Sequence, residues 1–247
     1  MNKKVILMNL DGWGKSPDSK VSAIDNANIP FINSLYKNYP SAQLRTDGLN
    51  VGLPEGQMGN SEVGHMNLGA GRIVYQDLAK INLAVANNTL AKEQVLVDAF
   101  TYAKANNKKV HFLGLVSDGG VHSHTSHLRG LIDATQQHGL QKVFVHAFTD
   151  GRDVDPKSGK QYIQDLQNYI ANTTVKLASV VGRYYAMDRD RRWERVKLAY
   201  DLLVNGIGTH STNAVASIEE SYKINVTDEF IHPTVIIDEH DKPLATI

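Results

Sequence analysis

The sequence predicts an α/β fold built around a parallel β-sheet. Three consecutive segments each combine a short apolar strand, a polar loop and a helix, and they span 110–138, 142–171 and 175–204. Strands that alternate with helices of roughly 10–15 residues form parallel sheets with right-handed crossovers. Apolar residues make up 42% of the chain and charged residues 21%, which is typical of a globular protein.

The composition narrows the classes of function. A length of 247 residues corresponds to one or two domains. The 26 Lys and Arg residues equal the 26 Asp and Glu residues, so no net charge attracts nucleic acid or a membrane. Absence of cysteine excludes disulfides, thiolate metal sites and a cysteine nucleophile. The N-terminal apolar run is too short for a signal peptide, and no segment has the length of a membrane span. We therefore expect a cytoplasmic protein without nucleic-acid or membrane partners.

The first predicted element is a buried strand at 5–8, a short apolar run between polar flanks. Asp11 follows it, where open α/β sheets place the residues that bind ligands. The same Asp11 is equally compatible with an ordinary Asp-Gly turn. An amphipathic helix that opens on proline is expected at 29–39, and a second strand at 42–45.

A glycine-rich stretch at 57–72 surrounds one serine, Ser61. Dense glycines let the backbone turn tightly or approach a ligand closely. The following residues have helical spacing, which places Ser61 near a helix N-terminus, where N–H groups and the helix dipole favour an anion. Such a serine is either a nucleophile, if its pKa is lowered, or an ordinary helix N-cap. Neither a nucleophile elbow nor a Walker A loop fits, because Gly64 is one residue late for the first and His65 replaces the lysine of the second.

Helical spacing continues over 75–106, with an interruption at 87–89 where Thr89 is a candidate N-cap. After the three strand–loop–helix units, a further helix is expected near 212–222 and a strand at 234–237. The chain then stops without a capping helix or a polar tail, so it looks interrupted rather than finished.

Each loop that follows one of the three strands carries polar residues suited to a ligand. They are His122 in the first loop, Arg152 and Asp153 in the second, and Arg183 in the third. In parallel sheets these loops lie along one edge, where ligands bind. Three such loops in succession favour a binding site at this edge.

His122, His124 and His127 suggest a metal cluster, since histidine is the commonest metal ligand. However, helical spacing fixes no carboxylate partner for them. We interpret His124 and His127 as loop or helix-start residues, and His122 as the better candidate for a site.

The segment 183–197 is rich in arginine and contains aromatic residues, as a nucleic-acid site would. Its interleaved acids cancel part of this charge, which makes a small phosphate or carboxylate bound by arginine the better interpretation. For Arg191, Arg192 and Arg195, a helix surface with ion pairs is the alternative.

The motifs together resemble those of the cofactor-independent (2,3-bisphosphoglycerate-independent) phosphoglycerate mutases. Five blocks follow one another in the order of that family, at 11–14, 59–65, 117–124, 150–153 and 182–190. The resemblance covers almost all of this chain but only about the first half of a family member. It implies a parallel-sheet phosphotransferase domain at 77–247 that lacks its C-terminal end. This domain would be inserted in a phosphatase-like domain of the alkaline phosphatase superfamily, of which 1–76 is the N-terminal, incomplete part.

The resemblance also implies roles for single residues. Asp11 and Ser61 match metal ligands of the family, which uses two manganese ions, and Ser61 matches its nucleophile. The positions that hold phosphoglycerate are matched by His122, Arg152, Asp153, Arg183 and Arg189. In the implied reaction, Ser61 takes the phosphate from 3-phosphoglycerate and returns it to the 2-hydroxyl of the same bound glycerate. The full-length family form is expected to be a monomer.

Two departures from the family bear on activity. Asn9 stands where the family usually has an aliphatic strand residue. The missing half would carry the Asp and His residues that complete both metal sites, so we expect this chain alone to lack mutase activity. The alternatives are a truncated, non-catalytic binding module, one half of a split enzyme, or another metal-dependent phosphatase or phosphomutase of the superfamily. The last would be expected to lack Arg183 and Arg189.

Overall fold

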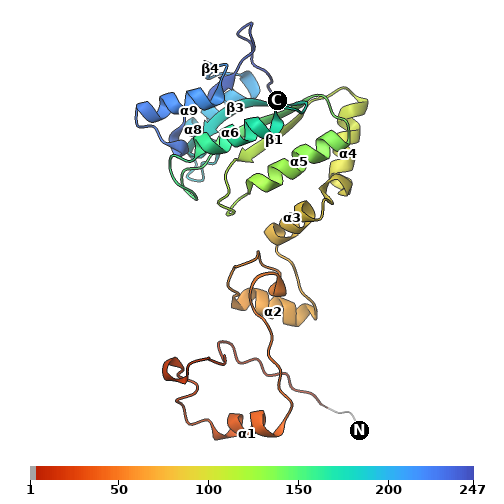
Figure 1. Ribbon diagram of the computed structural model, residues 1–247, viewed down its shortest axis with the longest axis vertical. Helices are drawn as coiled ribbons and strands as arrows, with labels where there is room; N and C mark the ends of the chain where they lie inside the picture. Colours follow the sequence, from red (N-terminus) through yellow and green to blue (C-terminus); the bar gives the residue numbers. More distant parts are fainter. Residues whose placement is uncertain (1–3) are drawn as a thin grey trace. The chain divides into compact units, whose positions relative to one another are not determined.

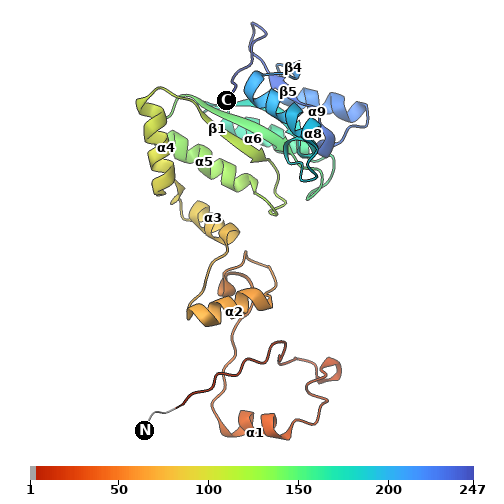
Figure 2. The same cartoon turned by 180° about the vertical axis from the view of Figure 1, so that it is seen from behind.

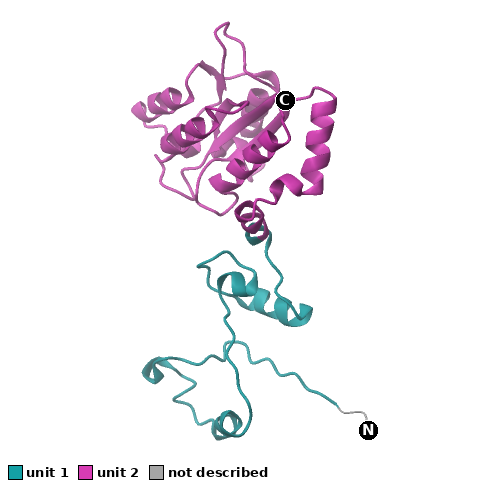
Figure 3. Ribbon diagram, turned by 45° about the vertical axis from the view of Figure 1, so that its right-hand side comes forward, with its two compact units in different colours: residues 1–79 teal, residues 80–247 magenta. Residues whose placement is uncertain are grey.

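The computed structural model describes residues 4–247 and divides into two compact units between Ala79 and Lys80 (Figure 3). No helix in the described part of the chain is both long and apolar enough to cross a membrane. The assignment of 1–76 to a phosphatase-like domain and of 77–247 to a phosphotransferase domain remains a prediction.

The described residues of the larger unit form a five-stranded sheet with the order β1-β2-β3-β5-β4 (Figure 1). β1 (Val110–Leu115), β2 (Val143–Thr149) and β3 (Val175–Gly182) are parallel, as the sequence predicts. β5 (Thr234–Ile236) runs antiparallel to β3, and the short β4 (Thr209–Ser211) pairs with β5 in parallel. The sequence pattern did not predict β4, because three residues carry too little periodicity. The sheet is therefore mostly parallel.

Helices cover both faces of this sheet. The helices of the larger unit are α4 (Gln94–Ala105), α5 (Thr125–Gln137), α6 (Gly159–Ile170), α7 (Arg183–Ala186), α8 (Trp193–Tyr200) and α9 (Ala214–Lys223), and α3 (Asp77–Ala86) spans the junction of the two units. Short turns of 3-10 helix form η3 (Leu90–Lys92) and η5 (Asp228–Phe230), and the π-helical turn η4 (Asp201–Asn205) extends α8. Figure 1 shows α5, α6 and α9 side by side on one face of the sheet, and Figure 2, the view from behind, shows α8 on the other side.

Two apolar clusters hold the sheet between its helices. The larger cluster packs the strands against fully buried side chains of three helices, Ile132 of α5, Ile163 of α6 and Ile218 of α9. The smaller cluster joins Val181 of β3 to Leu202 of η4. Each such side chain contributes about 1.5–3 kcal/mol when it is removed from water, so this unit has the apolar core that a stable domain needs.

A chain of polar side chains crosses the interior of the sheet. Nδ1 of His111 on β1 lies 2.9 Å from Nε2 of His146 on β2, and Nδ1 of His146 lies 2.8 Å from Oγ of Ser179 on β3. Burial, together with the neighbouring His111 and Lys109, lowers the pKa of His146 to about 4. His146 is therefore neutral at pH 7 and has a hydrogen-bond partner on each side.

The smaller unit has little regular structure. Its helical elements are η1 (Ser19–Val21), α1 (Pro30–Asn38), η2 (Gly48–Val51) and α2 (Ser61–Ala70). One small cluster of Val51, Leu53 and Val63 forms its buried apolar centre. Both predicted helices are confirmed, at 29–39 and after Ser61.

The two strands predicted in this unit, at 5–8 and 42–45, are wrong, because neither segment has regular secondary structure. A strand needs a neighbour to bond its backbone N–H and C=O groups, and the ladders of the described residues all lie in the larger unit. The apolar side chains are exposed instead, Val5 by 90% and Leu44 by 82%. An apolar run predicts burial only where a partner exists to bury it.

Acid should lower the free energy of unfolding of the larger unit, because the pKa of the buried His146 is lowered. In the folded protein the pKa of His146 is lowered from its ordinary value of 6.5 to about 4. Between these two pH values the unfolded chain is protonated at His146 and the folded chain is not. The free energy of unfolding should therefore fall by about 3 kcal/mol as the pH drops from 6.5 to 4, and above pH 6.5 this effect is absent. Urea unfolding followed by circular dichroism measures it.

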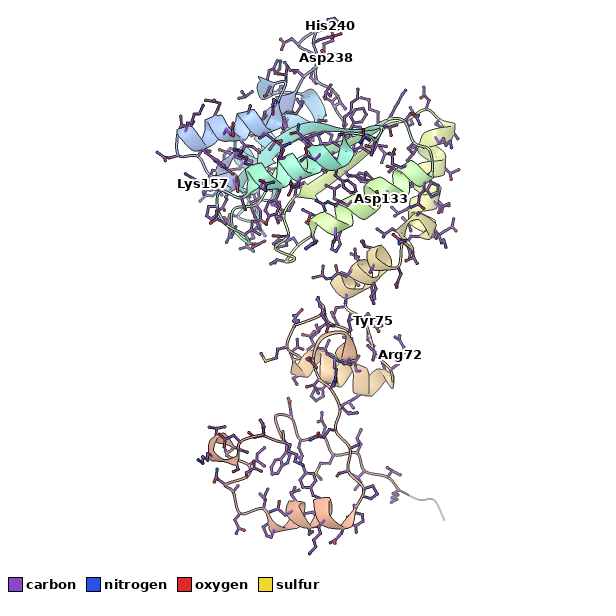
Figure 4. All side chains as sticks on the ribbon, viewed as in Figure 1. Arg72, Tyr75, Asp133, Lys157, Asp238 and His240 are labelled. Carbon is purple, nitrogen blue, oxygen red and sulfur yellow. The ribbon has the colours of Figure 1, made fainter. Side chains whose placement is uncertain are left out.

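His146→Gln should flatten this acid-dependent loss, because glutamine does not titrate. His240 lies on the hairpin after β5 (Figure 4) and its side chain is 72% exposed, so His240→Gln serves as the matched control. An identical pH dependence in His146→Gln and in the unmodified protein would contradict this account of the buried histidine.

Candidate functional site

Ser61 is the first residue of α2, and its hydroxyl does not cap the helix. The N-cap of α2 is Asn60, whose side chain accepts a hydrogen bond from the N–H of Val63 at 3.0 Å. The alternative that Ser61 is an ordinary N-cap is therefore wrong. Its hydroxyl instead donates to Oδ2 of Asp11 at 2.7 Å. Asp11 and Ser61, 50 residues apart in sequence, meet in the smaller unit.

His65, one helical turn after Ser61, is oriented by Asn9. Nδ2 of Asn9 lies 2.8 Å from Nε2 of His65. An amide NH₂ group only donates, so Nε2 of His65 accepts and the ring proton is placed on Nδ1. That nitrogen lies 2.8 Å from the carbonyl oxygen of Ser61 and 3.1 Å from its Oγ. In this tautomer Asp11, and not His65, accepts the hydrogen bond of the Ser61 hydroxyl.

Asp11 and Ser61 offer two adjacent oxygen ligands. Carboxylate and hydroxyl oxygens suit manganese and similar divalent ions. Among residues 4–247, no group of three or more His, Asp or Glu side chains is placed to hold a metal ion. The donor set therefore fits part of a metal site and leaves further ligands to be supplied.

In the larger unit, a pocket of about 180 Å³ lies where β1, β2 and β3 end. Its lining residues are His122, Arg152, Arg183, Tyr184, Met187, Asp188, Arg189, Asp190, Arg195 and Glu229. Four of the residues singled out from the sequence line this pocket, and the fifth, Asp153, bonds to Arg183. The polar loops thus converge at one place.

Arg183 is the best-anchored cation of this pocket. It is buried, and its Nη1 donates to Oδ1 of Asp150 and to Oδ2 of Asp153, both at 2.6 Å. Burial opposes the charged guanidinium, but the two carboxylates outweigh it and raise the pKa of Arg183. Both hydrogens of Nη1 are used in this way, which leaves Nε and Nη2 for other partners.

Asp150 connects the loops that follow β1, β2 and β3 through hydrogen bonds. This carboxylate is only 2% exposed and accepts hydrogen bonds from the Ser117 hydroxyl at 2.7 Å, from Arg183, and from the backbone N–H groups of Arg152 and Asp153. Burial alone would raise the pKa of Asp150, but these hydrogen bonds hold it below its ordinary value. Asp150 was not predicted as a site residue, because an Asp before a Gly is also typical of an ordinary turn.

The other pocket residues are less constrained. Nε2 of His122 lies 3.7 Å from Oδ2 of Asp153. The Arg152 side chain is 51% exposed and approaches Glu229 at 3.6 Å, and Arg189 is exposed. Glu229 comes from η5, far along the chain, and no motif in the sequence pointed to it.

Arg195 corrects one interpretation of the arginine-rich segment. Its ion pair with Asp188 at 3.2 Å agrees with the interpretation that Arg195 belongs to a helix surface with ion pairs. However, Arg195 also lines the pocket, and its guanidinium lies 4.0 Å from the centre of the Tyr184 ring. Reading this residue as surface alone was therefore incomplete.

His124 and His127 start α5, as interpreted from the sequence. His124 is the N-cap and accepts from the N–H of Ser126, and His127 is buried with Nε2 2.6 Å from Oδ1 of Asn82. Each has a structural hydrogen-bond partner, so neither points to a metal site.

Comparisons with known proteins agree with these features. The family model for the BPG-independent PGAM N-terminus (iPGM_N) matches residues 81–247. The chain is 85% identical over 247 residues to the 2,3-bisphosphoglycerate-independent phosphoglycerate mutase of Flavobacterium johnsoniae, and 56% identical over 247 residues to that of Parabacteroides distasonis. All of this chain is covered, but it spans only 49% and 48% of those relatives.

A crystal structure of Leishmania mexicana phosphoglycerate mutase at low cobalt concentration matches with a TM-score of 0.70 and 31% identity. The match covers 91% of this chain and 43% of that one. The chain therefore belongs to the family of BPG-independent phosphoglycerate mutases and corresponds to its N-terminal part.

Proposed function

We propose that this chain is the N-terminal part of an enzyme that interconverts 3-phosphoglycerate and 2-phosphoglycerate in glycolysis and gluconeogenesis. The observation that carries the proposal is the arginine pocket, where Arg183 is fixed by two carboxylates beside Arg152 and Arg189. Because the chain spans about half the length of its curated relatives, the activity belongs to the longer protein. A small phosphorylated metabolite as substrate agrees with a reaction in the cytoplasm.

The pocket is suited to a ligand with two anionic groups. Arg152, Arg183 and Arg189 supply charged donors for a phosphate and a carboxylate, and arginine binds both in a bidentate manner. Asp153 and His122 add polar groups that can bond the hydroxyls of glycerate. Such contacts keep the glycerate in place between the two phosphoryl transfers.

Ser61 is the proposed nucleophile. Its Oγ attacks the phosphorus of 3-phosphoglycerate, the bond from phosphorus to the 3-oxygen breaks, and phosphoserine and glycerate result. The 2-hydroxyl of the same glycerate then attacks the phosphoserine and frees the Ser61 oxygen. Asp11 accepts a hydrogen bond from the Ser61 hydroxyl at 2.7 Å, so a carboxylate lies beside the attacking oxygen and can take its proton.

Two Mn²⁺ ions are the proposed cofactors, and Asp11 and Ser61 would supply part of their ligands. When bound, such ions lower the pKa of a coordinated hydroxyl and stabilise charge on the transferred phosphoryl group. The remaining ligands would come from the part of the relatives that this chain does not span. The solved relative studied with cobalt supports a divalent transition metal in this family.

Arg183→Ala should weaken the use of phosphoglycerate. In this chain joined to the C-terminal half of the Flavobacterium johnsoniae relative, kcat/KM should fall at least ~10-fold, since a charge-assisted contact contributes about 1.5–3 kcal/mol. Steady-state kinetics measure this effect. The control is Arg191→Ala, because Arg191 does not line the pocket. Equal kcat/KM values for the two variants would remove Arg183 from the binding site.

Ser61→Ala should abolish turnover and leave the fold intact. In the same completed enzyme, no phosphopeptide containing position 61 should form with labelled phosphoglycerate, because the attacking oxygen is gone. Mass spectrometry of the digested protein measures this. Ser34→Ala, which removes an exposed hydroxyl in α1, should keep both the label and the turnover. Label on the Ser61→Ala protein would assign the covalent role to another residue.

A further inference from the structure

The four arginines of the pocket differ in how the chain's own carboxylates pair with them. Arg183 is bonded to two carboxylates at 2.6 Å each, and the nearest carboxylate to Arg195 is at 3.2 Å. Within residues 4–247, Arg189 has no ion-pair partner. Arg152 has one long contact, 3.6 Å from its Nη1 to Oε1 of Glu229. Arg152 is thus paired, but weakly.

Glu229 is held firmly by its backbone. On one side the Thr149 hydroxyl donates to the carbonyl of Asp228 at 2.7 Å, and on the other the N–H of Gly182 donates to the carbonyl of Ile231 at 2.7 Å. Both donors belong to the strands whose loops form the pocket. The segment η5 is therefore part of the pocket wall.

The backbone of Gly182 packs closely behind Glu229. A Cβ atom at Gly182 would lie 2.3 Å from the Glu229 carbonyl oxygen, so only glycine fits there. The buried carboxylate of Asp228 also accepts from the N–H of Gly159 at 2.7 Å, which joins η5 to the start of α6. The Glu229 side chain, 21% exposed, is thus presented to the pocket from a rigid base.

Arg152 is the movable partner of this pair. Its backbone is fixed by Asp150 at 3.2 Å, but its side chain is 51% exposed and makes only the long contact with Glu229. A long, exposed side chain can turn between two anions at low cost. A ligand carboxylate or phosphate in the pocket would therefore compete with Glu229 for the same guanidinium.

We infer that Glu229 limits how tightly the pocket holds phosphoglycerate, because it competes with the ligand for Arg152. It pairs with Arg152 until an anionic ligand takes its place, and its charge repels that ligand. The inference rests on the proposed function. A weaker hold on the anion lets the bound glycerate change position between the two transfers and lets the product leave.

Glu229→Gln tests this inference, because glutamine keeps the shape and removes the charge. The chain 1–247 is titrated with 3-phosphoglycerate and followed by amide NMR shifts of the loops at 150–153 and 182–184. Glu229→Gln should bind roughly 3- to 10-fold more tightly at low ionic strength, and the gain should shrink near ~0.5 M salt, where charges are screened. In an Arg152→Ala background, the gain should also be smaller, since the competition is gone.

Glu220→Gln is the matched control, because Glu220 is exposed on α9 and pairs with Lys223 outside the pocket. It should leave the affinity unchanged. Equal or weaker binding by Glu229→Gln, while Arg183→Ala abolishes binding, would overturn the inference and leave the proposed function standing. Absence of phosphoglycerate-dependent shifts in both the unmodified chain and Glu229→Gln would overturn the proposed function, and the inference with it.

Discussion

The buried ion pair between Asp150 and Arg183 is the constraint on which the larger unit's site depends. A buried carboxylate is costly unless its lone pairs are satisfied, and a buried guanidinium is costly without a partner. Asp150 meets this demand with the Ser117 hydroxyl, Arg183 and two backbone N–H groups, so it joins the loops after three adjacent strands. The pocket is formed because these loops cannot separate without leaving buried charges unpaired.

Much of the larger unit could be predicted from the sequence. The three strand–helix units repeat apolar runs and amphipathic periods that are typical of a parallel sheet, and β1, β2 and β3 lie where those runs are. His122, Arg152 and Arg183 follow directly from this topology, because the carboxyl ends of parallel strands share one edge. The strand predicted at 234–237 is confirmed as β5. Its antiparallel direction and the short β4 could not be predicted, since strand direction and three-residue pairing depend on partners far along the chain.

The rest of the site could not be predicted, for reasons that differ from residue to residue. Asp150 acts through four hydrogen bonds that form only when three loops meet, and Glu229 enters the pocket from η5, which carries no motif. In the smaller unit, the run at 5–8 has the composition of a strand but no partner among the described residues. The orientation of His65 depends on Asn9, 56 residues away, so local sequence could not reveal which nitrogen carries the proton.

We propose that this chain supplies the nucleophile and the substrate loops, and that the remaining metal ligands come from the other half of the family protein. The most direct test is conversion of 3-phosphoglycerate to 2-phosphoglycerate with manganese, by the purified chain alone and after mixing with a separately made C-terminal half of the Flavobacterium johnsoniae relative. We expect no turnover by the chain alone, and turnover in the mixture that is lost when the chain carries Ser61→Ala. Turnover by the chain alone that Ser61→Ala abolishes would contradict this proposal.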